Sequence, residues 1–327
     1  MILTHGLQDL LQAGSEPAVV SVGVFDGVHM GHQAILAANV ARAQELGLVP
    51  TVTTFSGHPK RILLGRAPKT LTSLEHRLAL FRRAGIGHTL VLEFTDELRS
   101  MPAEAFVEQI LLAGLSAKAF VLGFDSKFGM GRRGDPKFLR GLGHDVQVVP
   151  RVSVDQRAIS STAIREAVEL GDLEGAGRML GRPVSVLGRV VHGQALGRTL
   201  GFPTANLDLA HELHPPTGVY AGIAYVLSPD KDPALRRSIP AVANIGTRPT
   251  LAGSPPPLPT LPALPTVEVH LLDFQEDLYG ELLEFEFVAN LRPEQRFADL
   301  DALRNQISAD VLAARSALAD RKPAPRS

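Results

Sequence analysis

The chain has 327 residues, more than one hydrophobic core usually serves, so we expect two domains. Hydrophobic residues make up 45% and charged residues 20% of it, which is typical of a globular protein. A formal net charge of -1 argues against a protein that coats nucleic acid or anionic membrane. The absence of cysteine excludes disulfides, thiolate metal sites and cysteine nucleophiles. No apolar run approaches the length of a membrane helix, and we expect a cytoplasmic protein.

The first part of the chain alternates short apolar runs with helical patterns. The apolar runs that predict strands are residues 18–23, 48–54, 90–92, 119–123 and 146–149. Helices are predicted between them, and Thr72 with Glu75 has the pattern of a capping box that opens one of these helices. Such alternation predicts βαβ units and a parallel, doubly wound sheet. Ligands bind such sheets beyond the carboxyl ends of the strands.

The pattern changes near residue 182, after a helical stretch over residues 159–180. Short strand-like runs follow at residues 184–191, 218–226, 241–245, 267–272 and 281–288. They predict a small antiparallel barrel or sandwich. An apolar stripe at helical spacing then predicts a closing helix; it comprises Phe297, Leu300, Leu303, Ile307 and Val311. We therefore expect one domain over 1–182 and a second over 183–327.

Two histidines stand where the first strand meets the first helix. His29 and His32 are three residues apart with Gly31 between them. A helix N-terminus presents free N–H groups and a positive dipole end, which suits a phosphate. Imidazoles there can donate hydrogen bonds to a phosphate whose charge grows in the transition state. An isolated histidine pair of this kind is usually a chance surface feature, but its position at a βα turn favours a functional role.

A second group of phosphate-binding side chains is predicted at the helix that begins near residue 160. Ser160, Ser161 and Thr162 supply hydroxyls at the helix start, and Arg165 lies one turn further on. Hydroxyls and a guanidinium in this arrangement form an anion clamp that suits the β- and γ-phosphates of ATP. The alternative is a plain N-cap with a solvated arginine.

The second domain opens with a glycine-rich segment that includes Gly193 and Gly197 and ends in Pro203-Thr204-Ala205-Asn206. Glycines permit a loop to fold over phosphates with its N–H groups inward. The Thr204 hydroxyl and the Asn206 carbonyl oxygen are hard ligands of the kind that Mg²⁺ prefers. The segment contains no Walker A pattern, which excludes a P-loop NTPase.

Residues 267–274 alternate as a strand does. Val267, Val269 and Leu271 point to one side, and Glu268, His270 and Leu272 to the other. A glutamate on a barrel strand is usually a solvated outward residue, so the alternation by itself leaves the role of Glu268 open.

Five segments of the first part resemble one enzyme family. They are GVFDGVHMGH at 23–32, TFSGHP at 54–59, GFDSKFG at 123–129 with Arg132, Gly134 and Asp135 after it, ISSTAIR at 159–165, and LGRP at 180–183. These resemble the motifs of the bacterial bifunctional riboflavin kinase/FMN adenylyltransferase (FAD synthetase) family. In the second part, GRTLGFPTANL at 197–207, NIGTRPT at 244–250, EVHLLDF at 268–274 and LRP at 291–293 are similar to its riboflavin kinase signature. The resemblance covers nearly the whole chain.

The resemblance implies a Rossmann-like nucleotidylyltransferase domain followed by a β-barrel riboflavin kinase domain with a C-terminal helix. The barrel would convert riboflavin and ATP to FMN and ADP, and the first domain would convert FMN and ATP to FAD and pyrophosphate. The implied catalytic residues are His29, His32, Arg165 and, as general base, Glu268. The implied Mg²⁺ ligands are Thr204 and Asn206.

The resemblance also implies which residues contact ATP or flavin. In the first domain these are Gly23, Phe25, Asp26, Gly31, His58, Asp125, Phe128, Arg132, Ser160, Ser161 and Thr162. In the second they are Gly188, Gly193, Gly197, Arg198, Gly201, Pro203, Asn244 and Arg292. For Arg292 a structural ion pair is the alternative.

Two positions depart from the family pattern. Gly57 replaces a proline, which loosens the turn before His58, and Ser126 replaces a phenylalanine, which reduces apolar contact with a flavin or adenine. They leave open an enzyme in which only the kinase works. A flavin-binding regulatory protein with two degenerate sites is a second alternative, against which the intact histidine, ISST and PTAN segments argue. A nucleotidylyltransferase for another phosphate substrate is a third, which the attached riboflavin-kinase-like half disfavours.

The expected partners are small molecules, namely riboflavin, FMN, ATP and Mg²⁺. We expect no nucleic-acid or membrane partner and a monomer or weak homo-oligomer. Residues 254–265 are too rich in proline for a central strand, and we expect a surface loop in polyproline conformation.

Overall fold

The computed structural model describes residues 1–57, 68–193, 196–210, 212–227, 237–246 and 266–319. His58 and the proline-rich segment 254–265 lie outside the described residues. The chain forms two compact units, one of Met1–Ala163 with Met179–Gly181 and one of Ile164–Arg178 with Arg182–Ser327. The predicted division between residues 182 and 183 stays a prediction.

The first unit is built on a six-stranded sheet. In spatial order its strands are β1 (Ile2–His5), β4 (His88–Leu92), β3 (Val49–Phe55), β2 (Ala18–Val22), β5 (Ala117–Gly123) and β6 (Asp145–Val149). All neighbouring strands pair in parallel, as the alternating pattern predicted. A short hairpin of β7 (Ser153–Val154) and β8 (Arg157–Ala158) follows β6.

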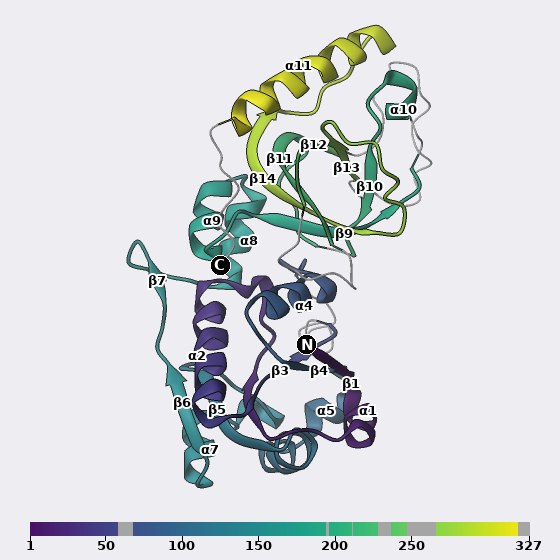
Figure 1. Ribbon diagram of the computed structural model, residues 1–327. Helices are drawn as coiled ribbons and strands as arrows, with labels where there is room; N and C mark the ends of the chain where they lie inside the picture. The colour runs from purple at the N-terminus through teal and green to yellow at the C-terminus, as the bar shows by residue number, and fades with distance from the viewer. Residues whose placement is uncertain (58–67, 194–195, 211, 228–236, 247–265, 320–327) are drawn as a thin grey trace. The chain divides into compact units, whose positions relative to one another are not determined.

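Helices cover both faces of this sheet, so its strands are buried and apolar. One face packs on α2 (Met30–Leu46) and α4 (Leu74–Arg83), and Figure 1 shows α2 alongside the strands. The other face packs on α1 (Gly6–Ala13), the π-helical segment η2 (Phe106–Gly114) and α7 (Pro136–Gly141). The remaining short elements are η1 (Asp26–Val28), α5 (Asp96–Ser100), α6 (Ala103–Ala105) and η3 (Met130–Arg132).

The strand order locates where a ligand should bind. From β2 the chain adds β3 and β4 on one side and then returns to add β5 on the other side of β2. This reversal creates a crevice beyond the carboxyl ends of β2 and β5. The turn that carries His29 and His32 follows β2, and the loop that carries Asp125 follows β5. The fold therefore places two of the predicted motifs at the switch point.

The helix start at Thr72 differs from the prediction. The N-cap of α4 is Ser73, whose hydroxyl accepts a hydrogen bond from His76 N at 3.2 Å. The Thr72 hydroxyl instead accepts a hydrogen bond from Gly27 N at 3.0 Å. The capping-box prediction was wrong because the backbone turn after β2 uses the Thr72 oxygen.

The second unit is a closed antiparallel barrel. Its strands, in order around the barrel, are β10 (Ala205–Asp208), β13 (Thr266–Leu271), β12 (Ser238–Gly246), β11 (Gly218–Leu227), β14 (Leu282–Arg292) and β9 (Ser185–Val191). The unit contains most of α8 (Ser161–Glu169) and α9 (Leu173–Leu180), together with α10 (Leu196–Leu200) and α11 (Leu300–Leu318). The α11 helix lies along the barrel and packs on β11, β12 and β14 (Figure 1).

The alternation predicted for β13 is confirmed. Val267, Val269 and Leu271 are buried, whereas Glu268 and His270 are half-buried on the other side. The next residue on that side, Leu272, joins Val219, Val242 and α11 in a separate apolar cluster. Part of the outer face of the barrel is therefore covered by α11, and Glu268 and His270 lie half-buried on the same face of β13 as Leu272.

A buried histidine makes the first unit sensitive to acid. His88 Nε2 lies 2.9 Å from the Thr4 hydroxyl oxygen, and burial lowers the pKa of His88 from 6.5. The unfolded chain therefore takes up a proton on His88 at a higher pH than the folded protein does. As a result, the free energy of unfolding decreases as pH falls below about 6.5. We expect the unfolding free energy of the wild type to fall relative to that of His88→Gln between pH 7.5 and 5. Urea denaturation of both proteins at several pH values measures this difference, and a constant difference would contradict the assignment.

Candidate active sites

The turn after β2 is a strained segment. Phe25 and Val28 have φ values of 52° and 39°, a region that residues other than glycine rarely adopt. The strain of a β-branched residue at positive φ is typical of functional turns. The Phe25 ring is buried and meets the edges of His32 at 5.2 Å and Phe81 at 5.5 Å between centroids. This packing fixes the turn that leads into α2.

The two histidines of the turn lie together at the start of α2. Their rings stack with centroids 3.6 Å apart and an angle of 15° between planes. His29 is the N-cap residue, and its Nδ1 accepts a hydrogen bond from His32 N at 3.3 Å. Because Nδ1 accepts, the proton of the neutral ring lies on Nε2, which makes that nitrogen a donor. A Cβ at Gly31 would lie only 3.2 Å from the His29 ring, so glycine permits this arrangement.

Asp26 organises the backbone beside the histidines. Its buried carboxylate accepts hydrogen bonds from Leu71 N at 2.9 Å and Thr72 N at 3.2 Å. Its carbonyl oxygen accepts a hydrogen bond from the Ser161 hydroxyl at 3.1 Å. The structure thus brings Asp26 and Ser161 together near the turn and gives the Asp26 carboxylate a structural task. A contact of Asp26 with a nucleotide stays a prediction.

The predicted ligand residues of the loop after β5 differ in their exposure to solvent. Phe128 is buried among Phe106 and Phe138, with ring centroids 5.5 and 6.4 Å away, so its position is that of a core residue. Asp125 and Arg132 are exposed. The loop is closed by reciprocal backbone hydrogen bonds of 3.0 Å between Phe128 and Gly134. Ligand contacts of Asp125, Phe128 and Arg132 stay predictions.

The hydroxyl cluster lies at the start of α8, as expected. The Ser160 hydroxyl accepts a hydrogen bond from Ala163 N at 3.2 Å, which is the geometry of an N-cap, and Thr162 is exposed. Arg165 is buried and belongs to the second unit, and its role in catalysis stays a prediction.

The barrel carries a pocket of about 180 Å³ between its outer face and α11. A row of directly paired residues crosses its floor. Glu268 on β13 pairs with Asn206 on β10 and with Asn244 on β12. The pairing continues from Asn244 to Val219 on β11 and from Val219 to Arg292 on β14. All five residues line the pocket, because residues directly opposite each other in a sheet share a face.

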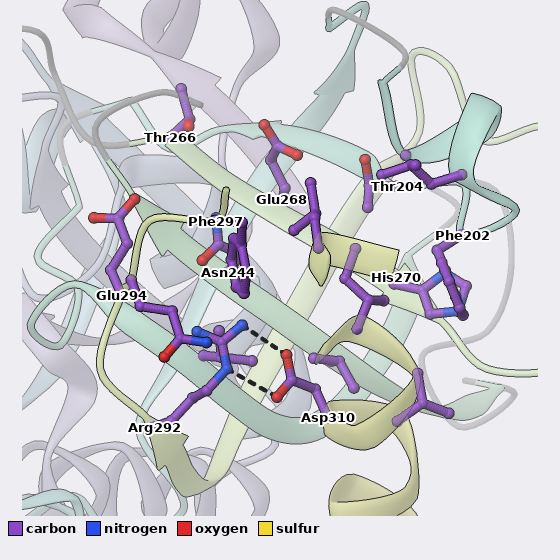
Figure 2. Close-up of a pocket in the computed structure, with 18 of the residues that line it drawn as sticks. Phe202, Thr204, Asn244, Thr266, Glu268, His270, Arg292, Glu294, Phe297 and Asp310 are labelled. Atoms are coloured by element: carbon purple, nitrogen blue, oxygen red, sulfur yellow. Dashed lines mark hydrogen bonds and ion pairs between the residues drawn. The ribbon is translucent and has the colours of Figure 1, made fainter. Parts of the chain in front are cut away.

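Glu268 and Thr204 form the polar centre of this pocket (Figure 2). Burial raises the pKa of the Glu268 carboxyl above its ordinary value, and a hydrogen bond from the Thr204 hydroxyl partly offsets this rise. A raised pKa makes the carboxylate a stronger base. The arrangement can therefore remove a proton from a bound hydroxyl.

Arg292 forms an ion pair at the other end of the row. Its Nε and Nη2 donate to Asp310 Oδ1 and Oδ2 at 2.9 and 2.8 Å, as Figure 2 shows. The Arg292 guanidinium also lies 5.7 Å from the centre of the Phe297 ring. The structural ion pair considered from the sequence is present, and binding of a phosphate or flavin by Arg292 stays a prediction.

Known families match both parts of the chain. Residues 11–163 match the family model described as FAD synthetase, and residues 180–318 match riboflavin kinase. The bifunctional riboflavin kinase/FMN adenylyltransferase of Pseudomonas fluorescens is 42% identical over 97% of each chain. That of Escherichia coli K12 is 38% identical over 99% of this chain and 100% of its own. The chain belongs to the bifunctional riboflavin kinase/FMN adenylyltransferase family. It has both activities, in the order expected from the sequence.

A solved structure supports the fold of this FAD synthetase family member. A Streptococcus pneumoniae protein described as a macrolide-efflux protein is 30% identical, with a TM-score of 0.76 over 96% of this chain and 99% of its own. The predicted α/β domain and antiparallel barrel with a C-terminal helix are confirmed. None of the helices in the described part of the chain is long and apolar enough to cross a membrane.

The glycines of the riboflavin kinase domain serve close backbone packing. A Cβ at Gly188 would lie 2.6 Å from the carbonyl oxygen of Asp208, and one at Gly197 would lie 2.4 Å from that of Phe202. A Cβ at Gly193 would meet the Asn206 side chain at 2.2 Å. Gly193 and Gly197 thus lie against the Thr204–Asn206 segment. Contacts of the four glycines 188, 193, 197 and 201, and of Arg198 and Pro203, with ATP stay predictions.

Sequence reasoning missed several residues that line the barrel pocket. They are Phe202, Thr266, His270, Glu294 and Asp310. Thr266 and His270 of β13 could have been predicted from the sequence, because each lies two residues from Glu268 and therefore on the same face of the strand. Asp310 could not have been predicted, because its ion pair with Arg292 depends on how α11 docks on β14.

Proposed function

We propose that the pocket on the barrel is the riboflavin kinase centre and that Glu268 is its general base. The observation that carries this assignment is the position of Glu268 in the pocket, where it stands between Asn206 and Asn244 in one row of paired residues and Thr204 lines the same pocket. Glu268 would take the proton of the ribityl 5′-hydroxyl while that oxygen attacks the γ-phosphorus of ATP and ADP leaves. In-line transfer of this kind depends mainly on positioning and charge stabilisation.

The pocket offers one polar and one apolar end. Leu303, Ile307 and Val311 of α11 contribute apolar lining, and Phe297 adds an aromatic ring. We place the flavin ring system against these side chains, so that its ribityl chain reaches Glu268. Asn244, next to Glu268 in the row, is available to hydrogen-bond the substrate.

Mg²⁺ fits the oxygen atoms beside Glu268. The Thr204 hydroxyl and the Asn206 side-chain carbonyl line the same pocket, and both are neutral oxygen ligands. In the described part of the chain, no group of three or more His, Cys, Asp or Glu is arranged to hold a metal. A site with few protein ligands suits Mg²⁺, which keeps several waters and binds substrate phosphates. When bound, the ion neutralises charge on the transferring phosphoryl group.

For the adenylyltransferase we propose that His29 and His32 stabilise the α-phosphate of a second ATP. The FMN phosphate oxygen attacks the α-phosphorus, and pyrophosphate leaves. The stacked rings at the start of α2 combine side-chain donors with the positive end of the helix dipole. Ser160, Ser161, Thr162 and Arg165 would hold the β- and γ-phosphates.

Metal removal tests the assignment of Mg²⁺. Riboflavin with ATP and Mg²⁺ should give FMN and then FAD when both products are followed by chromatography. A chelator in excess should stop FMN formation, because the γ-phosphoryl group loses its counter-charge, and added Mg²⁺ should restore it. FMN formation at an undiminished rate in the chelator would contradict the Mg²⁺ site.

The remaining expectations concern the surroundings of the enzyme. We propose a cytoplasmic protein with small-molecule partners only, which acts as a monomer or weak homo-oligomer. A sedimentation measurement at micromolar concentration tests the oligomeric state.

A further inference from the structure

We propose that His270 is a positioning residue of the kinase reaction, which fixes the Pro203–Thr204 peptide and so holds the Thr204 hydroxyl against Glu268. The inference rests on the proposed roles of Thr204 and Glu268. It assigns a function to a pocket residue that makes no proton transfer itself.

The contacts of His270 all lead to the segment before β10. Its Nδ1 lies 2.8 Å from the carbonyl oxygen of Pro203. Because a carbonyl only accepts, Nδ1 carries the proton and donates. The imidazole also meets the Phe202 ring nearly edge-on, with centroids 5.5 Å apart and an angle of 85° between planes, and Figure 2 shows the two side by side. One side chain of β13 therefore holds both residues that precede Thr204.

A hydrogen bond to the Pro203 carbonyl also fixes the residue that follows. The peptide unit between Pro203 and Thr204 is planar and trans. Fixing the direction of the Pro203 carbonyl therefore also fixes the position of the Thr204 nitrogen and Cα. The Thr204 hydroxyl in turn donates to Glu268. Glu268 and His270 are two residues apart on one face of β13, so the strand holds the segment at two adjacent points.

Other anchors of this segment lie on both sides of the Pro203–Thr204 peptide. Downstream, β10 begins at Ala205, which pairs with Val269 of β13. Phe202 N donates to Gly197 O at 2.8 Å, and Arg304 Nε on α11 donates to Leu200 O at 3.3 Å. Neither contact restrains the plane of the Pro203–Thr204 peptide. Loss of the imidazole should therefore leave the segment attached but allow this peptide to rotate.

The test compares two substitutions of His270 in the full-length enzyme. The His270→Ala variant removes the donor, and His270→Asn keeps a neutral N–H donor close to the position of Nδ1. We expect His270→Ala to lower the kinase kcat roughly tenfold, since small misplacements of reacting groups are costly, with a smaller change in the KM for riboflavin. We expect His270→Asn to recover most of this loss.

Rescue by asparagine separates positioning from a general structural defect. Both His270→Ala and His270→Asn remove the imidazole ring and its packing on Phe202, but only His270→Asn keeps the donor to the Pro203 carbonyl. If ring packing alone mattered, both variants would lose kcat to the same extent.

His214 provides a matched control. Its Nδ1 lies 2.7 Å from Pro215 O, a contact of the same type in the same unit, and it does not line the pocket. His214→Ala should retain the kinase kcat, and all variants should retain FAD formation from FMN. A normal kcat in His270→Ala, or an equal loss in His270→Asn, would overturn the inference. If Glu268→Gln kept its kinase activity while His270→Ala lost it, the base assignment of Glu268 would be overturned, but the positioning role of His270 would not.

Discussion

Replacing Glu268 by glutamine should abolish FMN formation and leave FAD formation from supplied FMN intact. Glutamine keeps the size of the side chain and can still accept a hydrogen bond from Thr204, but it cannot take the proton of the ribityl hydroxyl. Loss of a general base typically costs about 10²–10⁴-fold in rate, so we expect a kinase kcat reduced on this scale. The measurement is the initial rate of FMN formation from riboflavin and ATP with Mg²⁺.

The pH dependence of the wild-type kinase provides an independent check on Glu268. Burial raises the pKa of this carboxyl above 4.5, and the reaction needs the deprotonated form. Activity should therefore fall on the acid side at a pH above that of an ordinary glutamate. Glu276→Gln is a suitable control, because Glu276 is exposed and pairs with Arg237 on the surface. A Glu268→Gln variant that forms FMN at the wild-type rate would contradict the base assignment.

Replacing His32 by alanine should have the opposite effect on the two activities. FMN formation should continue, and FAD formation from FMN should fall by about 10²–10³-fold, the scale for the loss of one transition-state donor. The His32 ring packs on both His29 and Phe25, so its loss also removes support from the neighbouring imidazole. The measurement is pyrophosphate release from FMN and ATP.

The control for His32 is His144, which packs against Phe120 in the same unit. His144→Ala should retain pyrophosphate release from FMN and ATP. Wild-type enzyme that releases no pyrophosphate under these conditions would favour a kinase-only enzyme, the alternative that Gly57 and Ser126 leave open. Equal loss of both activities in His32→Ala would contradict separate sites.

Local periodicity was sufficient to predict much of the fold and the strand face on which Glu268 lies. The apolar alternation over residues 267–272 predicted a strand with Glu268 and His270 on one face, which β13 confirms. The same reasoning placed the histidines at a βα turn, and the strand order puts that turn at the switch point of the sheet. These predictions succeeded because the side-chain period of a strand is a local property.

Features that depend on tertiary docking were not predictable in the same way. The Arg292–Asp310 ion pair joins β14 to α11, and no local pattern specifies that contact. The core position of Phe128, which packs on Phe106, was likewise not predicted, and its contact with a ligand stays a prediction. Thr72 was predicted as a helix cap, but a backbone amide 45 residues away uses its oxygen. In each case the partner is distant in sequence.

Riboflavin should be converted to FAD at two separate sites, one containing Glu268 and the other His32. Mixing the Glu268→Gln and His32→Ala proteins with riboflavin, ATP and Mg²⁺ tests whether the two sites work independently. Each variant alone should form little or no FAD, and the mixture should form FAD, because FMN made by one protein is adenylylated by the other. A mixture that forms no more FAD than the separate variants, although each retains its other activity, would contradict the account.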